Sequence, residues 1–422
     1  MNNPSISRLS FLAVIMGFIF YCYEYLLRIS PSVMQGELML YFKINATMLG
    51  TLSAFYYYSY TPLQLVVGAI VDKYEIKKVL VLSALMCAVG TMFIAWSDSY
   101  VMASTGRFLQ GLGSAFAWVS ILKLGVLFLP KRWLGFVSGV GSVFGFLGAA
   151  AGQIAMGYVV QNLGWKAVLN VLAIVGIPLA FLFYFVLRKA ENKLNVNITT
   201  NINTSLKGWL VRFLIVTRKP QVWCAGGIAA LSFLPTIVFA ELWGVTYISK
   251  LYNYSTAQSS FVTAMIFVGW AIGSLLMGVI SIFFHNRLAI MQTGIILAFI
   301  TSLIMLYVPL SFASLCLFCI LFGVFSAIEV LTFPMGIEVV AKKIAGIAGA
   351  FVNFLCMLSG MLFQRIAGQV LDFEWSGQVD SNGVRIYSIT DYKVAVSIIP
   401  ISLAICAIFI IMLKIRENKL GE

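Results

Sequence analysis

The chain has 422 residues, of which 61% are hydrophobic and only 10% charged, and its mean hydropathy is +0.97. A soluble globular domain carries about 25% charged residues, so this composition excludes a water-soluble fold for most of the chain. The net charge of +13 would suit a nucleic-acid partner, but the placement of the basic residues argues against one.

The apolar segments are roughly 20 residues or longer, which is the length of a membrane-spanning helix, and they lack the alternation of barrel strands. A bilayer requires every backbone polar group to be satisfied internally. We therefore predict an all-α membrane protein with twelve transmembrane helices in two pseudo-symmetric six-helix bundles. The predicted spans are 9–29, 46–71, 79–97, 100–129, 133–160, 167–187, 222–247, 257–283, 288–307, 310–337, 345–371 and 394–413.

The longest polar interruption separates the sixth and seventh spans. We predict an N-terminal bundle over residues 1–187, a cytoplasmic linker over 188–221 and a C-terminal bundle over 222–422. The Asn/Thr-rich centre of the linker, Asn195–Thr204, is typical of a flexible segment, and Leu206–Val216 is typical of a short amphipathic helix on the membrane surface.

The basic residues predict the orientation of the spans. Nineteen of the 28 Lys and Arg residues fall on the side of the N-terminus, five fall on the other side, and the rest lie within spans. The positive-inside rule then places both termini in the cytoplasm of a multi-pass inner-membrane protein. The excess charge faces anionic membrane lipids rather than nucleic acid.

The two halves repeat each other at an offset of about 210 residues. Two parallel six-helix halves are an arrangement of transporters whose solute site lies at mid-membrane between the halves. The matching pairs are Gly68 with Gly278, Gly135 with Gly346, Gln153 with Gln364, Gly157 with Gly368 and Lys77 with Arg287.

A loop motif, residues 68–78, follows the second span. The alternative is that it is an ordinary loop whose basic residues only follow the positive-inside rule. It resembles the G-x-x-x-D-[RK]-x-G-[RK]-[RK] loop of the major facilitator superfamily, with Glu75 in place of the second glycine and one extra residue before the final basic pair. The resemblance implies a conformational latch made by Gly68, Asp72, Lys73, Lys77 and Lys78.

Arg107 begins a second motif, Arg107-Phe-Leu-Gln-Gly111, which resembles the R-x-x-x-G motif of the same superfamily. Snorkelling of Arg107 to the outer interface is the alternative. The segments Tyr23–Met34 and Glu241–Gly244 also look like bacterial intraphagosomal amino-acid transporters and, more distantly, lysosomal dipeptide carriers. This narrower resemblance implies an amino acid or short peptide as the solute.

The spans contain few ionisable residues, and each is costly in hydrocarbon unless it faces the interior or a water-filled cavity. Glu24 and Arg28 are four residues apart and can pair directly on one helix face. Glu24 then serves as a proton carrier or as half of a purely structural ion pair. The full set is Glu24, Arg28, Arg107, Lys123, Glu241, Glu329 and Arg365.

The candidates for substrate binding or coupling are Glu24, Arg28, Arg107, Glu241, Glu329 and Tyr57. Glu241, loosely the counterpart of Glu24, either binds a substrate ammonium or a proton or lies near the outer headgroups. Glu329 either lines the cavity or packs against a basic partner. Tyr57 belongs to a tyrosine-rich run that lines the solute path on one face or else serves as an aromatic belt or in helix packing. The roles of Lys123 and Arg365 stay open.

These features together predict a secondary active transporter that works by alternating access, with a small-molecule substrate and protons as partners. The absence of a G-x-x-x-x-G-K-[ST] loop disfavours ATP as the energy source. We expect no enzyme activity, no cofactor and no metal. Amino-acid symport is the first hypothesis; efflux of an amphipathic drug or siderophore, a non-transporting membrane sensor and a channel are the alternatives.

Overall fold

The computed structural model describes residues 8–194, 206–284 and 286–421. Within these ranges the regular secondary structure is helical, apart from one isolated β-bridge between Val379 and Arg385. Eleven helical segments are long and apolar enough to cross a membrane. The predicted all-α membrane architecture is confirmed, while the predicted flexible centre of the linker, Asn195–Thr204, lies outside the described residues.

The second predicted span, 46–71, is the one absent from these eleven. Its helix, α3 (Ala46–Gln64), is followed by a short helix, α4 (Val67–Lys73), instead of running on as one segment. Tyrosine, serine and threonine side chains make α3 polar for a membrane helix. The count of twelve therefore stays a prediction.

The first half of the chain contains nine α-helices. They are α1 (Arg8–Val33), α2 (Gln35–Phe42), α3, α4, α5 (Ile76–Ala95), α6 (Tyr100–Ser114), α7 (Ala117–Phe128), α8 (Leu134–Leu163) and α9 (Trp165–Leu194).

The second half follows after α10 (Leu206–Thr217), the helix predicted at the membrane surface. Its helices are α11 (Pro220–Pro235), a π-helical segment η2 (Thr236–Trp243), α12 (Gly244–Tyr252), α13 (Thr256–Phe283), α14 (Arg287–Tyr307), α15 (Phe312–Ser326), a 3-10 turn η3 (Ala327–Leu331), α16 (Thr332–Glu338), α17 (Ala345–Glu374), α18 (Ile389–Val396) and α19 (Ile398–Gly421).

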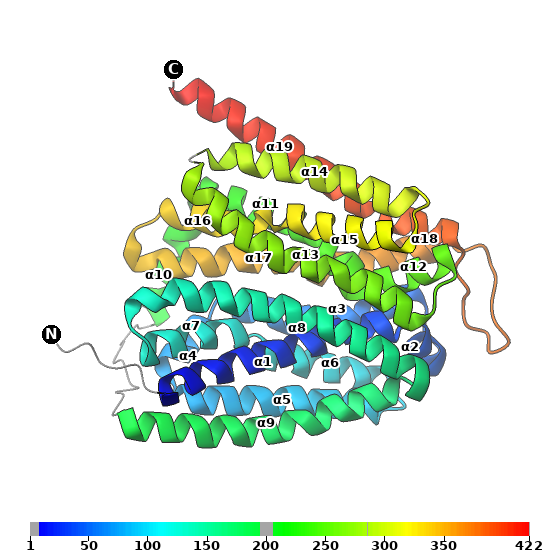
Figure 1. Ribbon diagram of the computed structural model, residues 1–422, viewed down its shortest axis with the longest axis horizontal. Coiled ribbons are helices and arrows are strands. Elements are labelled where there is room, and N and C mark those ends of the chain that lie inside the picture. Colours follow the sequence, from blue (N-terminus) through cyan, green and yellow to red (C-terminus); the bar gives the residue numbers. More distant parts are fainter. Residues whose placement is uncertain (1–7, 195–205, 285, 422) are drawn as a thin grey trace.

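The two halves lie side by side along a seam (Figure 1). Helix α3 packs along α17, and α8 packs along α13, so each half contributes two helices to the seam. The start of α1, the end of α9, the start of α10 and the end of α19 lie at one end of the bundle, which we call the linker end. Helices α2 and α18 lie at the opposite end, which we call the far end.

The predicted internal repeat is visible in the backbone at the far end. Lys43 ends α2 with φ 51°, and Asn253 ends α12 with φ 54°; these are the two left-handed non-glycine residues in the described chain. Two residues later, Asn45 and Ser255 cap the next helix by accepting a hydrogen bond from its first turn. Each half therefore enters its first seam helix through the same turn.

A pair of repeat-related hydrogen bonds closes the far end across the seam. The backbone N–H of Thr47 donates to Asp372 Oδ2 at 2.9 Å, and the backbone N–H of Ala257 donates to Gln161 Oε1 at 3.0 Å. Both donors lie in the first turn of a seam helix, where N–H groups lack intrahelical partners. We call Asp372 and Gln161 the far-end caps; each comes from the opposite half.

Two further residues support the Asp372 cap. Arg385 donates to Asp372 Oδ1 at 3.0 Å, and the hydroxyl of Tyr387 also donates to Asp372 Oδ1. The Tyr387 oxygen in turn accepts the backbone N–H of Ala46 at 3.0 Å. Burial and the neighbouring carboxylate raise the pKa of Tyr387, so its hydroxyl keeps its proton and remains a donor.

The seam is tighter at the far end than at the linker end. A Cβ at Gly157 would collide with Ser260 of the other half, and one at Gly368 would collide with Ala46. The repeat-related glycines nearer the linker end, Gly135 and Gly346, have open space where a Cβ would stand. Close helix approach at small residues is a common packing device in membranes, and across the seam Gly360 on α17 is likewise tight against Tyr57 on α3.

Several predicted spans are interrupted helices. The fourth is divided between α6 and α7, the seventh contains η2, and the tenth contains η3. The short helices α2 and α18 were not predicted, because eight-residue elements give too little periodic signal. The interruptions occur beside the polar residues of the seam.

Candidate functional site

The centre of the seam contains a buried ion pair on α1. Arg28 and Glu24 lie 2.7 Å apart and are 3% and 0% exposed. The direct pairing predicted from their four-residue spacing is confirmed. The Arg28 guanidinium also lies over the rings of Tyr25, Tyr56 and Tyr60, at 4.7, 5.5 and 5.1 Å from their centroids.

Helix α3 supplies the hydroxyl groups around this pair. The Tyr56 hydroxyl donates to Glu24 Oε1 and accepts from Arg28 Nε at 3.4 Å. Tyr57, the next residue, reaches the other half, where its hydroxyl donates to Glu241 Oε2. The tyrosine run therefore lines the seam at these two positions, and the aromatic-belt alternative is wrong for them.

Arg107 stabilises a weak point of α1. Pro31 has no N–H to bond the carbonyl four residues earlier, that of Leu27. Arg107 Nη1 donates to this carbonyl at 2.8 Å, and Nη2 donates to the Arg28 carbonyl at 3.3 Å. Arg107 is 1% exposed, so the snorkelling alternative is wrong. These two hydrogen bonds hold the α1 backbone in place next to the ion pair.

Glu241 lies in the π-helical segment η2, a kind of element that is frequent at functional sites. Two repeat-related glutamines bond this segment: Gln153 Nε2 donates to the Ala240 carbonyl at 3.0 Å, and Gln364 Nε2 to the Ile237 carbonyl at 3.2 Å. Glu241 is fully buried. Its alternative placement near the outer headgroups is therefore wrong.

Glu329 is close to the seam but apart from the other two carboxylates. It lies in η3 and accepts a hydrogen bond from the Cys356 thiol at 3.6 Å. Among the described residues no basic side chain forms an ion pair with it. The alternative of packing against a basic partner is wrong, and Glu329 remains a candidate for lining the path.

The motif residues at the linker end make their contacts within the first half. Lys123 Nζ lies 2.7 Å from Asp72 Oδ1, and Lys77 Nζ lies 2.6 Å from Glu191 Oε2. Lys78 pairs with Glu75 at 3.1 Å.

Among the described residues, no bond joins the remaining motif residues to the second half. Lys73 lies over the neighbouring ring of Tyr74, and a Cβ at Gly68 would meet open space. A latch between halves thus stays a prediction. Arg365, whose role the sequence left open, is exposed.

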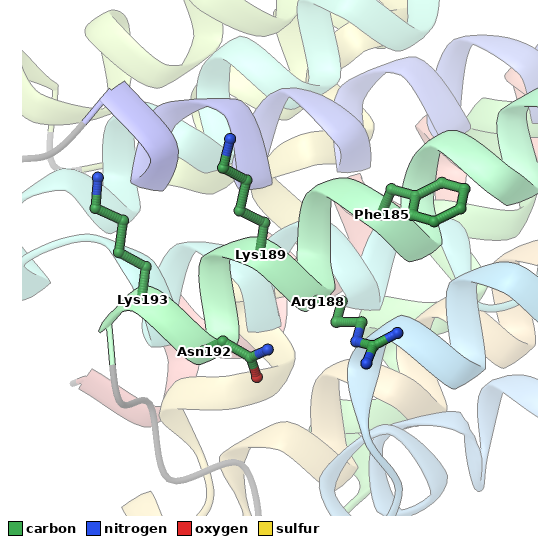
Figure 2. Close-up of a pocket in the computed structure, with 5 residues that line it drawn as sticks. All are labelled: Phe185, Arg188, Lys189, Asn192 and Lys193. Carbon is green, nitrogen blue, oxygen red and sulfur yellow. The ribbon is translucent and has the colours of Figure 1, made fainter.

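A surface pocket of about 610 Å³ lies away from the seam, and those of its lining residues that belong to the described part of the chain are all on α9. Figure 2 shows its lysines extending to one side of the helix and its arginine to the other. Because it is an open surface near the linker end, it suits contact with anionic lipid heads better than enclosure of a solute. Its lining residues are Phe185, Arg188, Lys189, Asn192 and Lys193.

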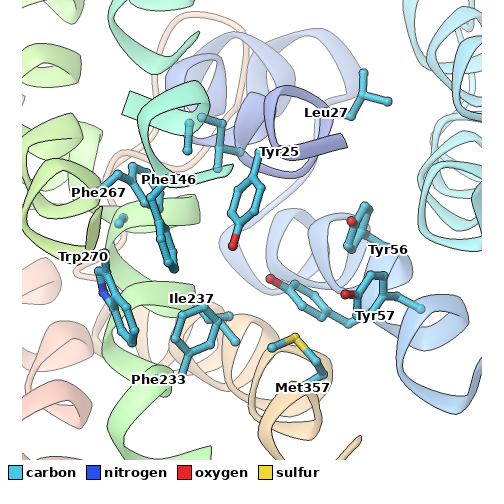
Figure 3. Close-up of a cluster of buried hydrophobic side chains, with 14 of the residues drawn as sticks. Tyr25, Leu27, Tyr56, Tyr57, Phe146, Phe233, Ile237, Phe267, Trp270 and Met357 are labelled. Atoms are coloured by element: carbon cyan, nitrogen blue, oxygen red, sulfur yellow. The ribbon is translucent and has the colours of Figure 1, made fainter. Parts of the chain in front are cut away.

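Aromatic side chains surround the polar centre (Figure 3). The rings of Phe146 and Trp270 stack across the seam with centroids 5.2 Å apart, and Phe233 meets Trp270 edge-on at 5.1 Å. Sequence reasoning did not single out these residues, because aromatics are common in every span. Gln153 and Gln364 were noted only as a repeat pair, although two glutamines within apolar spans were a usable signal.

Comparison with known proteins agrees with this architecture. A family model for the Major Facilitator Superfamily matches residues 9–364. The probable sulfoacetate transporter SauU of Cupriavidus necator is 20% identical over 382 residues, covering 83% of this chain and 85% of its own length. The uncharacterized transporter YybO of Bacillus subtilis is 23% identical over 264 residues, covering 60% of this chain and 59% of its own length.

Solved structures show the same fold. A bacterial homologue of the human lysosomal transporter Spinster, in its inward-facing and unoccupied conformation, superposes with a TM-score of 0.75 at 13% identity, covering 96% of this chain and 95% of its own. The nucleoside transporter NupG gives 0.72 at 12% identity, covering 96% and 99%. The family model spans most of the chain, and the chain therefore belongs to the Major Facilitator Superfamily.

Proposed function

We propose that this transporter moves a small polar solute, an amino acid or short peptide, by alternating access coupled to protons. The observation that carries the proposal is the contact between Tyr57 and Glu241, which joins the two halves at the buried ion pair of Glu24 and Arg28. A solute or proton that changes this contact changes the interaction between the halves.

The two seam carboxylates have the character that proton coupling requires. Glu24 Oε2 and Glu241 Oε1 are both buried and lack a hydrogen-bond partner in the described chain. A buried carboxylate oxygen without a donor is costly, so it favours either uptake of a proton or a bound donor group. Each carboxylate can thus alternate between two states as the halves move.

The orientation in the membrane belongs to the same proposal. The linker end faces the cytoplasm, and the far end faces outward, because of the 19-to-5 distribution of basic residues. The far-end caps, which join the halves at Thr47 and Ala257, support a far end that is closed to the outside. Import from outside then requires the far-end caps to separate.

Uptake into proteoliposomes tests the proposal. Labelled amino acids and dipeptides are supplied with and without an imposed pH gradient, acidic outside, and saturable uptake stimulated by the gradient is expected. Glu24→Gln and Glu241→Gln should each remove the stimulation, whereas Glu374→Gln, at an exposed position on α17, should keep it. Equal stimulation in all variants would refute the coupling roles, and flux that never saturates would favour a channel.

A further inference from the structure

The unsatisfied side-chain atoms of the seam are mainly hydrogen-bond acceptors. Glu24 Oε2, Glu241 Oε1, Gln153 Oε1 and Gln364 Oε1 are buried acceptors without a partner in the described chain. Arg107 Nε is an unpaired N–H donor there, and the unpaired hydroxyls of Ser53, Ser259 and Ser260 on the seam helices can donate or accept. A buried polar group without a partner is costly. The site therefore lacks donors, and a ligand that supplies several N–H groups would complete it.

The positive charge of Arg28 is already engaged by the protein. Its guanidinium pairs with Glu24 at 2.7 Å and lies over three tyrosine rings. Arg107 is directed at backbone carbonyls of α1. An anionic solute would therefore meet two carboxylates before it found a free cation.

Aromatic side chains lie beside the polar centre. Figure 3 shows Tyr56 and Tyr57 on one side, Phe146, Phe233 and Trp270 on the other, and Tyr25 between them. Phe146 is 8% exposed, against 4% for Phe233 and 0% for Trp270. The apolar surface next to the buried carboxylates is therefore largely aromatic.

We infer that the site recognises a protonated amine attached to an apolar body. The ammonium lies between Glu241 Oε1 and Glu24 Oε2, where it supplies the missing donors, and the apolar body lies against Phe146, Phe233 and Trp270. Aromatic faces favour a neighbouring cation. This inference rests on the proposed function and narrows it: the ammonium, rather than a carboxylate or sulfonate, is the recognised group.

Matched pairs of compounds test the inference by ligand-induced thermal stabilisation of the purified full chain. The panel is phenylalanine and N-acetylphenylalanine, leucine and N-acetylleucine, phenethylamine and phenylacetate, and sulfoacetate. At least one free amine should bind, and its partner lacking the ammonium should bind about 10- to 100-fold more weakly, the loss expected for a charged hydrogen bond. Binding of sulfoacetate, or equal binding within every pair, would overturn the inference.

Two variants address the aromatic wall. Phe146→Leu keeps an apolar side chain and should weaken binding of the aromatic amine about tenfold, and Trp270→Leu should do the same if it folds. Trp96→Leu, at a position 65% exposed, is the matched control. Unchanged affinity in Phe146→Leu would contradict the placement of the apolar body.

The outcome also separates this inference from the proposed function. Saturable uptake of a solute without an amine would overturn the inference and leave gradient-driven transport standing. Specific amine binding without flux under any gradient would leave the inference standing and overturn transport, favouring a sensor.

Discussion

The far-end cap at Asp372 sets how firmly the halves are held together, and Asp372→Asn measures its contribution. Of the three bonds to Asp372, the one from Thr47 crosses the seam, whereas the donors Arg385 and Tyr387 belong to the same half as Asp372; Tyr387 separately accepts the Ala46 N–H across the seam, and that bond remains in the variant. A charge-assisted hydrogen bond contributes about 1.5–3 kcal/mol and a neutral one about 0.5–1.5 kcal/mol. Asn keeps an acceptor but loses the charge, so the closed far end should lose about 1 kcal/mol.

A loss of this size shifts the equilibrium between closed and open far ends about fivefold, because each 1.4 kcal/mol is about tenfold. Asp372→Ala removes the acceptor as well, and its shift should reach about thirtyfold. Gln161→Ala removes the neutral cap of the repeat and should shift the equilibrium about fivefold, as for the loss of one neutral bond.

Distances between two spin labels, at Leu40 in α2 and Val394 in α18, report this equilibrium. Both positions are exposed, and they lie at the far end in opposite halves. A longer-distance population should grow in the order wild type, Asp372→Asn, Asp372→Ala. Asp380→Asn is the control, since Asp380 bonds only within its own loop. An unchanged distribution in Asp372→Ala would refute the reasoning.

Three other substitutions have expected outcomes. Tyr57→Phe removes the donor to Glu241 across the seam and should lower saturable uptake at least about tenfold, whereas Tyr58→Phe should leave uptake unchanged. Gly368→Ala forces a methyl group onto the opposite backbone and should lower thermal stability by about 1–3 kcal/mol; Gly346→Ala, in open space, should not. Lys43→Asn places a residue that tolerates the left-handed conformation at φ 51° and should raise the melting temperature by about 1–3 °C.

Much of the scaffold followed from the sequence because it depends on local patterns. Long apolar runs predicted the helices, and the four-residue spacing predicted the pairing of Glu24 with Arg28. The left-handed backbone conformation shared by Lys43 and Asn253 then showed that the sequence repeat is also a repeat of local structure. Such features are encoded within one helix or one turn, so no knowledge of how the halves pack was needed.

The contacts across the seam could not be predicted in the same way. The bond from Tyr57 to Glu241 joins residues 184 positions apart, and its existence depends on the register between two bundles. The π-helical segment that presents Glu241 has no periodic signature, and Asp372 lies just beyond the predicted eleventh span, 345–371, where no pattern marks it as a contact of the other half. Arg107 was correctly placed among the buried residues, but its role beside Pro31 depends on a carbonyl that the sequence does not reveal.

The departures from the repeat indicate where this transporter became specific. Two pairs keep the same residue at the seam in both halves: Gly157 and Gly368 serve close packing, and Gln153 and Gln364 bond the η2 segment. Where the halves differ, a charge is present in one half only: the cap is the charged Asp372 in the second half and the neutral Gln161 at the equivalent position of the first. Alternating access needs two states of similar free energy, and a perfectly symmetric seam gives a solute no preferred side. The asymmetric charges therefore bias the closure of the far end, and the solute must supply interaction energy comparable with that bias to reverse it.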